Sequence, residues 1–277
     1  CYKTASLLLD TYEMTKDSRY LTMATTLYAD LDTAAKTYSL SKAGNNYRHT
    51  WSSDPSPDLW LDGLYMILPF RAEYAKYIND TEELDLIVDR MQWVSDNMYN
   101  KDTGLFYHAA DSSTSNSGTY WLRAIGWYAA AIVDVMDSME GANLDAMKAQ
   151  LVKLVDGMKA CQNTSNGMWL NNMAASKSST NPYETSGTAF FTYGLLWGVN
   201  NGYLDEATYM PVIKKAWNYL KKTALQKDGR VGYVQPIGEK AIPGQIVDAN
   251  STANFGVGAF LLAACEYVRY LEAPVNK

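Results

Sequence analysis

The chain has 277 residues, of which 47% are hydrophobic and 19% are charged, and its formal net charge is −6 at pH 7. The charged fraction is below the roughly 25% usual for soluble domains. No run of Lys and Arg occurs, so neither nucleic acid nor an acidic membrane surface is expected as a partner, and no apolar run approaches the roughly 18 residues of a membrane span.

Cysteine and histidine are too scarce for a disulfide framework or a zinc site, because the chain holds three Cys and two His. The first residues, CYKTASLLLD, lack the charged region and cleavage site of a signal peptide and predict the start of an amphipathic helix. Three N-x-S/T sequons begin at Asn79, Asn163 and Asn250. Together with the low charged fraction they favour an extracytoplasmic location.

Two kinds of helical pattern alternate along the chain. The chain opens with a pair of helices predicted at 3–14 and 18–38. Segments that are apolar on nearly all sides predict buried helices at 59–78, 118–139, 183–201 and 252–271. Amphipathic segments between them predict helices that face water at 81–99, 143–162 and 206–226. No sustained alternation with a period of two appears, so any strands are expected to be short and to lie in the turns.

A glycine followed closely by an aromatic or apolar pair recurs about every sixty residues. The segments read AGNNYRH, TGLFYHA, NGMWLNN and DGRVGYV, and their glycines are Gly44, Gly104, Gly167 and Gly229. A fixed period of this size indicates a repeated supersecondary unit. We therefore predict an all-α toroid in which inner helices ring an axis and outer helices cover them; an open α-solenoid is the alternative.

The predicted helix count bears on domain organisation. A closed barrel of six helical hairpins has twelve helices, whereas nine are predicted here. We expect residues 1–277 to form one α/α-barrel catalytic domain, with about three further helices preceding Cys1.

The loops that follow the outer helices are expected to gather at one end of the toroid, over its cavity. Both histidines, His49 and His108, lie in these loops. Aromatic residues accompany them at Trp51, Tyr107, Trp169 and Tyr233. Aromatic walls with a few polar groups suit a sugar, because CH faces stack on rings while hydroxyls need hydrogen bonds.

Three charged residues lie in equivalent positions at the starts of inner helices, namely Asp62, Arg123 and Glu184. We expect all three side chains to project near the same end of the cavity. Arg123 and Trp127 are four residues apart and share a helix face, where the guanidinium can lie over the indole. Structural alternatives stay open: Asp62 can satisfy helix N-terminal amides or pair with Arg123, and Arg123 can serve only as the buried partner of Glu184. Asp58 is the expected N-cap before Asp62.

The chain contains, in order, the stretches WLDGLYMILPFRAEYAKY, DTGLFYHAAD, WLRAIGWYAAAIVDVMD, ETSGTAFFTYGLLWGVNNGYL and GVGAFLLAACEY. Together they resemble glycoside hydrolase family 105, the unsaturated rhamnogalacturonyl hydrolases, and the related unsaturated glucuronyl hydrolases of family 88. The combination of W-x-D-G-L-Y-M with a later W-x-R-A-x-G-W-Y is specific and spans most of the chain.

The resemblance implies an (α/α)6 barrel and an unusual reaction, the hydration of the C4=C5 bond of a terminal unsaturated uronic acid. Such ends are what polysaccharide lyases leave. In this reading Asp62 is the general acid/base that protonates C4, water adds at C5, and the neighbouring sugar, commonly rhamnose, is released. No metal or organic cofactor is implied. Many members of the family work in the cytoplasm, so the compartment stays open.

The resemblance also implies which residues line the sugar site: His49, His108, Trp121, Arg123 and Trp127. Arg123 is the natural partner for the substrate carboxylate, since a guanidinium matches a carboxylate bidentately. Glu184 is expected beside it, from its place at the helix start. An apolar pocket raises the pKa of a carboxylic acid, which fits Asp62 as a proton donor to carbon.

One departure from the family pattern concerns a second active-site Asp. Family members carry it just before a G-K-like turn, with which Lys3 would align, so we expect that Asp upstream of Cys1.

Two other functions stay open at this point. An ordinary inverting glycosidase or a sugar epimerase could use the same toroid; inverting hydrolysis needs two carboxyls roughly 6.5–9.5 Å apart, for which Asp62 and Glu184 are the candidates. The other alternative is a non-catalytic carbohydrate-binding toroid. The oligomeric state is not indicated.

Overall fold

The structure is a computed structural model that describes residues 2–37, 59–110, 120–174, 183–238, 241–242 and 244–273. Within these ranges the α-helices are α1 (Ser6–Thr15), α2 (Ser18–Thr37), α3 (Leu61–Ile78), α4 (Thr81–Asn97), α5 (Leu122–Met136), α6 (Gly141–Cys161), α7 (Thr185–Asn200), α8 (Glu206–Tyr219) and α9 (Asn254–Glu272). A 3-10 turn, η1 (Tyr2–Ala5), leads into α1, and a π-helical turn, η2 (Leu220–Ala224), extends α8. Each predicted helix is therefore present, with bounds shifted by a few residues.

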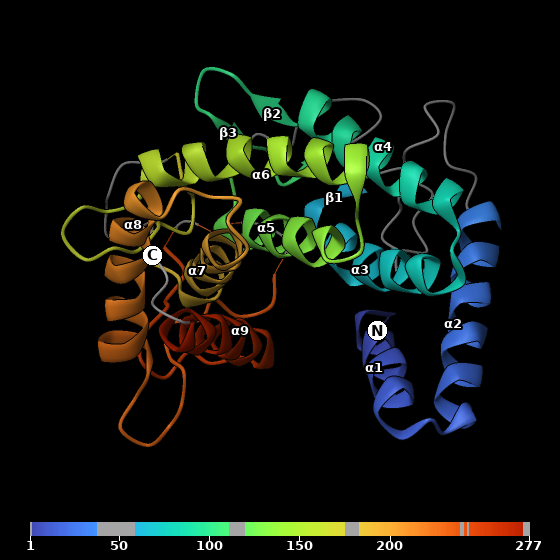
Figure 1. The fold of residues 1–277 in the computed structure, drawn as a ribbon. Coiled ribbons are helices and arrows are strands. Elements are labelled where there is room, and N and C mark those ends of the chain that lie inside the picture. The colour runs from blue at the N-terminus through green and yellow to red at the C-terminus, as the bar shows by residue number, and fades with distance from the viewer. Residues whose placement is uncertain are drawn as a thin grey trace.

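The helices form two layers around one axis. The inner helices α1, α3, α5, α7 and α9 succeed one another around this axis, and α2, α4, α6 and α8 lie outside them (Figure 1). Neighbouring inner helices pack on each other from α3 through α9, and α4, α6 and α8 each pack on the inner helix that precedes them. This arrangement is the predicted α/α toroid.

The burial of the inner helices explains their composition. Every residue of α5 except Asp134 is buried, and every residue of α7 except Asn200. Protein surrounds these helices on all sides, so they need no polar face. This agrees with the prediction from their apolar pattern. α9 differs from that prediction, because Leu261 is 55% exposed and Leu271 is 65% exposed. It packs chiefly on α7, so only one of its faces is covered within the described part of the chain.

Glycines let α5 and α7 approach closely near their N-termini. A Cβ atom added to Gly126 would lie 3.1 Å from the Cα atom of Gly187, and one added to Gly187 would lie 2.4 Å from Cγ of Leu122. The close approach brings the start of α7 against the start of α5, where Arg123 lies.

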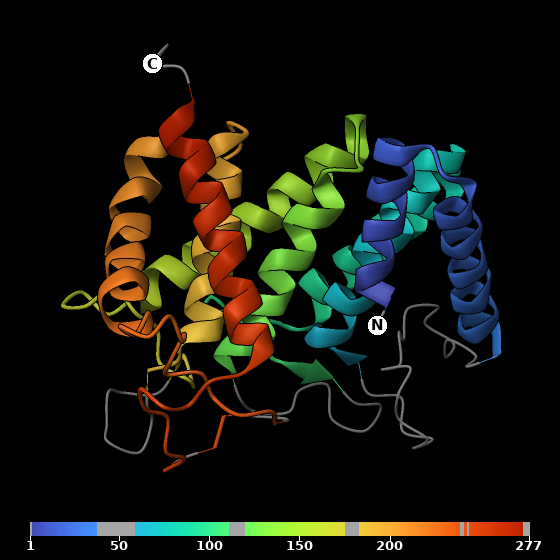
Figure 2. The same ribbon diagram turned by 90° about the horizontal axis from the view of Figure 1, so that it is seen from below.

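Short strands lie in the turns, as the sequence predicts. β1 (Leu59–Trp60) pairs antiparallel with β4 (Ala109–Ala110), and β2 (Tyr99–Asn100) pairs antiparallel with β3 (Leu105–Phe106). The N-terminal ends of α3, α5, α7 and α9 lie together at one end of the toroid, the lower end in Figure 2.

A backbone hydrogen bond recurs at this end and links each unit to the next. The first N–H of an inner helix donates to the carbonyl of the residue four positions after the repeat glycine of the following unit. The pairs are Leu61 with His108 (3.1 Å), Leu122 with Asn171 (2.8 Å) and Thr185 with Tyr233 (2.8 Å). We call this contact the inter-unit bond. The glycines concerned, Gly104, Gly167 and Gly229, all have left-handed φ values of +71°, +80° and +87°, which favour glycine. Gly44 lies outside the described residues.

Candidate active site

The three charged residues predicted at the helix starts lie at the loop end, each next to an inter-unit bond. Asp62 directly follows Leu61, Arg123 directly follows Leu122, and Glu184 directly precedes Thr185. The repeat therefore brings these side chains to one end of the toroid. His49, Trp51 and Asp58 fall outside the described residues, and the N-cap position of α3 belongs to Trp60 rather than to Asp58 as predicted.

Asp62 combines partial burial with an unpaired oxygen. Its side chain is half-buried, and Oδ2 is inaccessible to solvent and has no hydrogen-bond partner among the described residues. Burial raises the pKa of Asp62 to about 6, against the nearby positive charge of Arg123, which lowers it. With this pKa roughly a tenth of the carboxyls carry a proton at pH 7, far more than for an ordinary aspartic acid, and a general acid must be protonated to act.

The guanidinium of Arg123 is held between two rings and two carbonyls. It lies 4.7 Å from the ring centre of Trp121 and 4.5 Å from that of Phe255. Nη1 donates to the backbone carbonyl of Gln235 at 2.7 Å, and Nη2 donates to that of Pro236 at 3.0 Å. The structure thus corrects the prediction that the guanidinium lies over Trp127, since Trp121 takes that place.

Trp127 instead belongs to an aromatic cluster between the inner helices. Its ring centre lies 4.8 Å from that of Tyr65 and 4.2 Å from that of Phe190. The four-residue spacing in α5 gave Arg123 and Trp127 a common face, but the close packing of α5 on α7 leaves the Trp127 ring against Phe190.

Glu184 is the N-cap of α7 and is fully buried. Its Oε1 accepts from the backbone N–H of Ser186 (3.0 Å), the Ser186 hydroxyl (2.7 Å) and the backbone N–H of Gln235 (3.0 Å), and its Oε2 accepts from the Gly187 N–H (2.9 Å). Nη1 of Arg123 lies 4.0 Å from Oε1. These contacts give Glu184 a structural role as the cap of α7, and its predicted contact with the substrate stays a prediction.

His108 lies between two tryptophans at the same end. Its ring is buried, and its centre is 5.9 Å from the ring centres of both Trp60 and Trp121, with the planes nearly perpendicular. His108 also supplies the carbonyl that receives the N–H of Leu61. These contacts connect His108 with both indole rings and with the N-terminal end of α3.

Two residues of this region were not predicted as site residues. Phe255 is the second residue of α9, the position that Asp62 holds in α3 and Arg123 holds in α5. Gln235 lies two residues after the inter-unit residue Tyr233, and its side chain is fully buried. Counting positions from the helix starts would have found Phe255, whereas the residues equivalent to Gln235 in the other units, Ala110 and Met173, are apolar and give no such signal.

A cavity of about 540 Å³ lies between α1, α3, α5, α7 and α9, and residues near the C-terminal ends of α3 and α5 form much of its wall. One wall is Tyr65, a helical turn beyond Asp62 on α3. Lys3 Nζ lies 2.6 Å from Asp134 Oδ2, and the Tyr193 hydroxyl donates to Asp134 Oδ1 at 2.6 Å. Asp62 itself does not line this cavity. The cavity is therefore separate from the group formed by Asp62, Arg123, Trp121 and His108, none of which lines it.

Neither a metal-binding cluster nor a membrane-spanning helix is present in the described ranges. They contain no group of three or more His, Cys, Asp or Glu side chains placed to hold a metal ion. None of the helices described is long and apolar enough to cross a membrane.

Comparison with known proteins agrees with the fold and the motifs. The chain is 31% identical over 234 residues to an unsaturated 3S-rhamnoglycuronyl hydrolase of Formosa agariphila; the match covers 77% of this chain and 58% of that protein. It therefore spans a little over half the length of that relative.

Solved structures resemble the whole toroid. A glycosyl hydrolase family 88 protein from Bacteroides vulgatus is 36% identical with a TM-score of 0.78, over 98% of this chain and 73% of that chain. A family 105 glycoside hydrolase of C. acetobutylicum ATCC 824 is 27% identical with a TM-score of 0.79, over 95% of this chain and 78% of that chain. The family model for Glycosyl Hydrolase Family 88 matches residues 2–271, and the chain belongs to this family.

Proposed function

We propose that this protein removes the terminal 4,5-unsaturated uronic acid from oligosaccharides made by polysaccharide lyases. The observation that carries the proposal is Asp62, a half-buried carboxyl with an unpaired oxygen and a pKa raised by burial to about 6. Protonation of an alkene carbon needs an acid that still holds its proton near neutral pH. Residues 1–277 are proposed to act as one α/α-barrel catalytic unit.

The proposed reaction begins with proton transfer from Asp62 to C4 of the enol ether. The positive charge that develops at C5 is shared with the ring oxygen, and water adds to C5. The proton that this water loses returns to the Asp62 carboxylate, which restores the acid. The hemiketal formed at C5 then opens, and the hemiacetal left at C1 releases the neighbouring sugar.

Arg123 is the proposed partner of the uronic carboxylate. Its guanidinium has five N–H donors, and among the described residues two of them are bound to backbone carbonyls. His108, Trp121 and Trp127 are proposed to line the sugar site, and His49 is proposed to join them from its loop. The rings offer apolar faces for the CH groups of the sugar.

The sugar next to the uronic acid is proposed to be rhamnose. The Formosa agariphila relative is an unsaturated 3S-rhamnoglycuronyl hydrolase. Elimination across C4 and C5 removes the stereochemical difference between galacturonic and glucuronic acid at C4. Discrimination among substrates therefore falls on the neighbouring sugar, and an unsaturated galacturonyl–rhamnose unit is the substrate that we propose first.

Ultraviolet absorbance tests the proposal, because hydration of C4=C5 removes the chromophore. We expect absorbance to fall when the protein meets lyase-generated oligosaccharides from rhamnogalacturonan, and fragments from glucuronan and ulvan serve to compare the neighbouring sugars. Constant absorbance with all three substrate classes would exclude the proposed reaction. Turnover of the corresponding saturated glycosides would point instead to an ordinary glycosidase.

A further inference from the structure

Gln235 lies where the starts of two inner helices meet, although it belongs to neither helix. It is part of the connection between η2 and α9, and its side chain is fully buried. A buried amide is retained only where its donors and acceptors find partners, because an unpaired polar group in the interior is costly.

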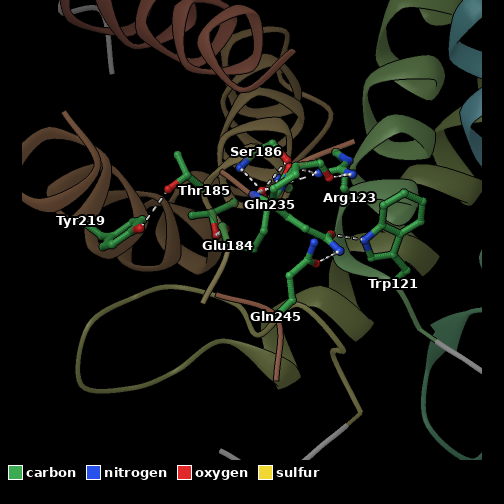
Figure 3. A network of polar contacts seen from close by, with 11 residues as sticks. Trp121, Arg123, Glu184, Thr185, Ser186, Tyr219, Gln235 and Gln245 are labelled. Atoms are coloured by element: carbon green, nitrogen blue, oxygen red, sulfur yellow. Dashed lines mark hydrogen bonds and ion pairs between the residues drawn. The ribbon is translucent and has the colours of Figure 1, made fainter. Parts of the chain in front are cut away.

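All four hydrogen-bonding groups of Gln235 are used, and three of them bind residues of the candidate site (Figure 3). The backbone N–H donates to Glu184 Oε1 at 3.0 Å, and the backbone carbonyl accepts from Arg123 Nη1 at 2.7 Å. The side-chain Oε1 accepts from the indole N–H of Trp121 at 2.7 Å, and Nε2 donates to Gln245 Oε1 at 2.8 Å.

The contact with Trp121 sets the orientation of a ring that other site groups touch. The indole N–H is the only polar group of that side chain. The ring carries the Arg123 guanidinium at 4.7 Å and meets His108 edge-on at 5.9 Å. A rotation of Trp121 would therefore move the surfaces against both the cation and the histidine.

We propose that Gln235 is a positioning residue that holds Trp121 and Arg123 in the geometry that receives the unsaturated uronyl group. It binds these two residues by different groups, Trp121 through its side chain and Arg123 through its carbonyl, so one residue fixes their relative placement. Glu184 and Gln245 hold Gln235 from the other sides. The inference rests on the proposed function and adds a residue that does not itself touch the reacting atoms.

The test replaces Gln235 by methionine, which keeps the side-chain volume and removes the amide. We expect KM for the unsaturated disaccharide to rise at least about tenfold while kcat changes less than about threefold, because a loss of binding common to the ground state and the transition state raises KM alone. Trp121→Phe removes the other half of the hydrogen bond. The double variant should lower kcat/KM by no more than about twofold beyond Trp121→Phe alone, because residues that act through one contact are not additive.

Gln226→Met is the matched control. Gln226 lies in the same connection and also uses its amide to bind backbone, donating to the carbonyls of Thr223 and Ala224. It should lose thermal stability with KM unchanged. A KM for Gln235→Met within about twofold of this control, with both proteins folded, would overturn the inference.

The indole N–H resonance of Trp121 separates this inference from the proposed function. If the wild-type protein turns over none of the unsaturated substrates, the proposed function fails, and the resonance still tests Gln235. It should move in Gln235→Met and stay in place in Gln226→Met. An indole resonance unchanged in Gln235→Met would show that the amide does not position the ring.

Discussion

At the scale of single residues, Asp62 shows how a carboxyl can be kept in an apolar segment. Its neighbours on α3 are buried, Oδ2 has no partner among the described residues, and the positive charge of Arg123 only partly offsets the effect of burial on its pKa. The arrangement is unfavourable for stability and favourable for a proton donor. Both consequences can be measured.

Asp62→Asn should abolish turnover and stabilise the folded protein. Loss of the general acid is expected to lower kcat/KM by about 10²–10⁴-fold. The pKa of Asp62 is raised from 3.8 to about 6, so its contribution to stability is present below about pH 4 and is lost as pH rises through about 6. At pH 7.5 the variant should gain about 1–2 kcal/mol, less than the full linkage value because the amide is also desolvated.

Urea unfolding at pH 4.5 and pH 7.5 measures this gain, which should shrink at the lower pH. Asp89→Asn makes the same chemical change on the exposed face of α4 and should alter stability by less than about 0.5 kcal/mol. An Asp62→Asn variant that is active, or equally stabilised at both pH values, would contradict the assignment.

The pH profile gives an independent prediction for Arg123. With Asp62 as the acid, kcat/KM should fall as pH rises above about 6. The charge of Arg123 lowers the pKa of Asp62, so Arg123→Met should move this alkaline limb to higher pH as well as weaken binding. A limb that stays at the same pH would mean that another group titrates.

At the scale of elements, the helices were predictable because their two patterns have different physical causes. An inner helix has protein on both sides and an outer helix has water on one side, so the alternation of all-apolar and amphipathic segments indicated the layers. The exposed face of α9 was not predictable, since its pattern matches that of α7 while its neighbours differ.

The contacts within the site were harder to predict than the residues. Asp62, Arg123 and Trp121 could be placed from the repeat and the motifs. The partners of Arg123 are the carbonyls of Gln235 and Pro236, which are present at every position of a chain and carry no sequence signal. The capping role of Glu184 could not be predicted either. A glutamate at the start of a helix can be a cap, a partner in an ion pair or a catalyst, and the sequence is the same in all three cases.

The repeat glycines allow a matched test at this scale. A Cβ added to Gly167 would lie 2.4 Å from the backbone carbon of Lys215, whereas one added to Gly229 would meet nothing within 4 Å. Both glycines have φ near +80° or above, so alanine at either position carries a backbone cost of about 1–2 kcal/mol. Gly167→Ala should lose about 1–3 kcal/mol more than Gly229→Ala in urea unfolding. Equal losses would mean that φ alone explains the glycines.

At the scale of the whole molecule, the inner helices share one axis, and a ligand at the loop end would contact several of them at once. Binding should therefore stabilise the entire toroid. The inactive Asp62→Asn variant with an unsaturated disaccharide at about 100 times its Kd should gain about 2.7 kcal/mol. This corresponds to a rise in Tm of roughly 5–10 °C.

The corresponding saturated disaccharide is the control for this experiment. Its C4 carries a hydroxyl and its ring is not flattened by the double bond, so it should raise Tm much less at equal concentration. Equal shifts with both sugars would favour a carbohydrate-binding toroid without selectivity for the unsaturated end.

The inter-unit bond has a consequence for how such a protein can change its substrate during evolution. Each bond is made four residues after a glycine, and the interval from the bonded residue to the next inner helix differs among the units: 14 positions from His108 to Leu122, 14 from Asn171 to Thr185, and 21 from Tyr233 to Asn254, where Gln235 keeps its own contacts. An insertion in one of these intervals does not change the inter-unit bond itself or the residue with which each inner helix begins. The connections at this end can therefore lengthen and diverge while Asp62, at the start of α3, keeps its place.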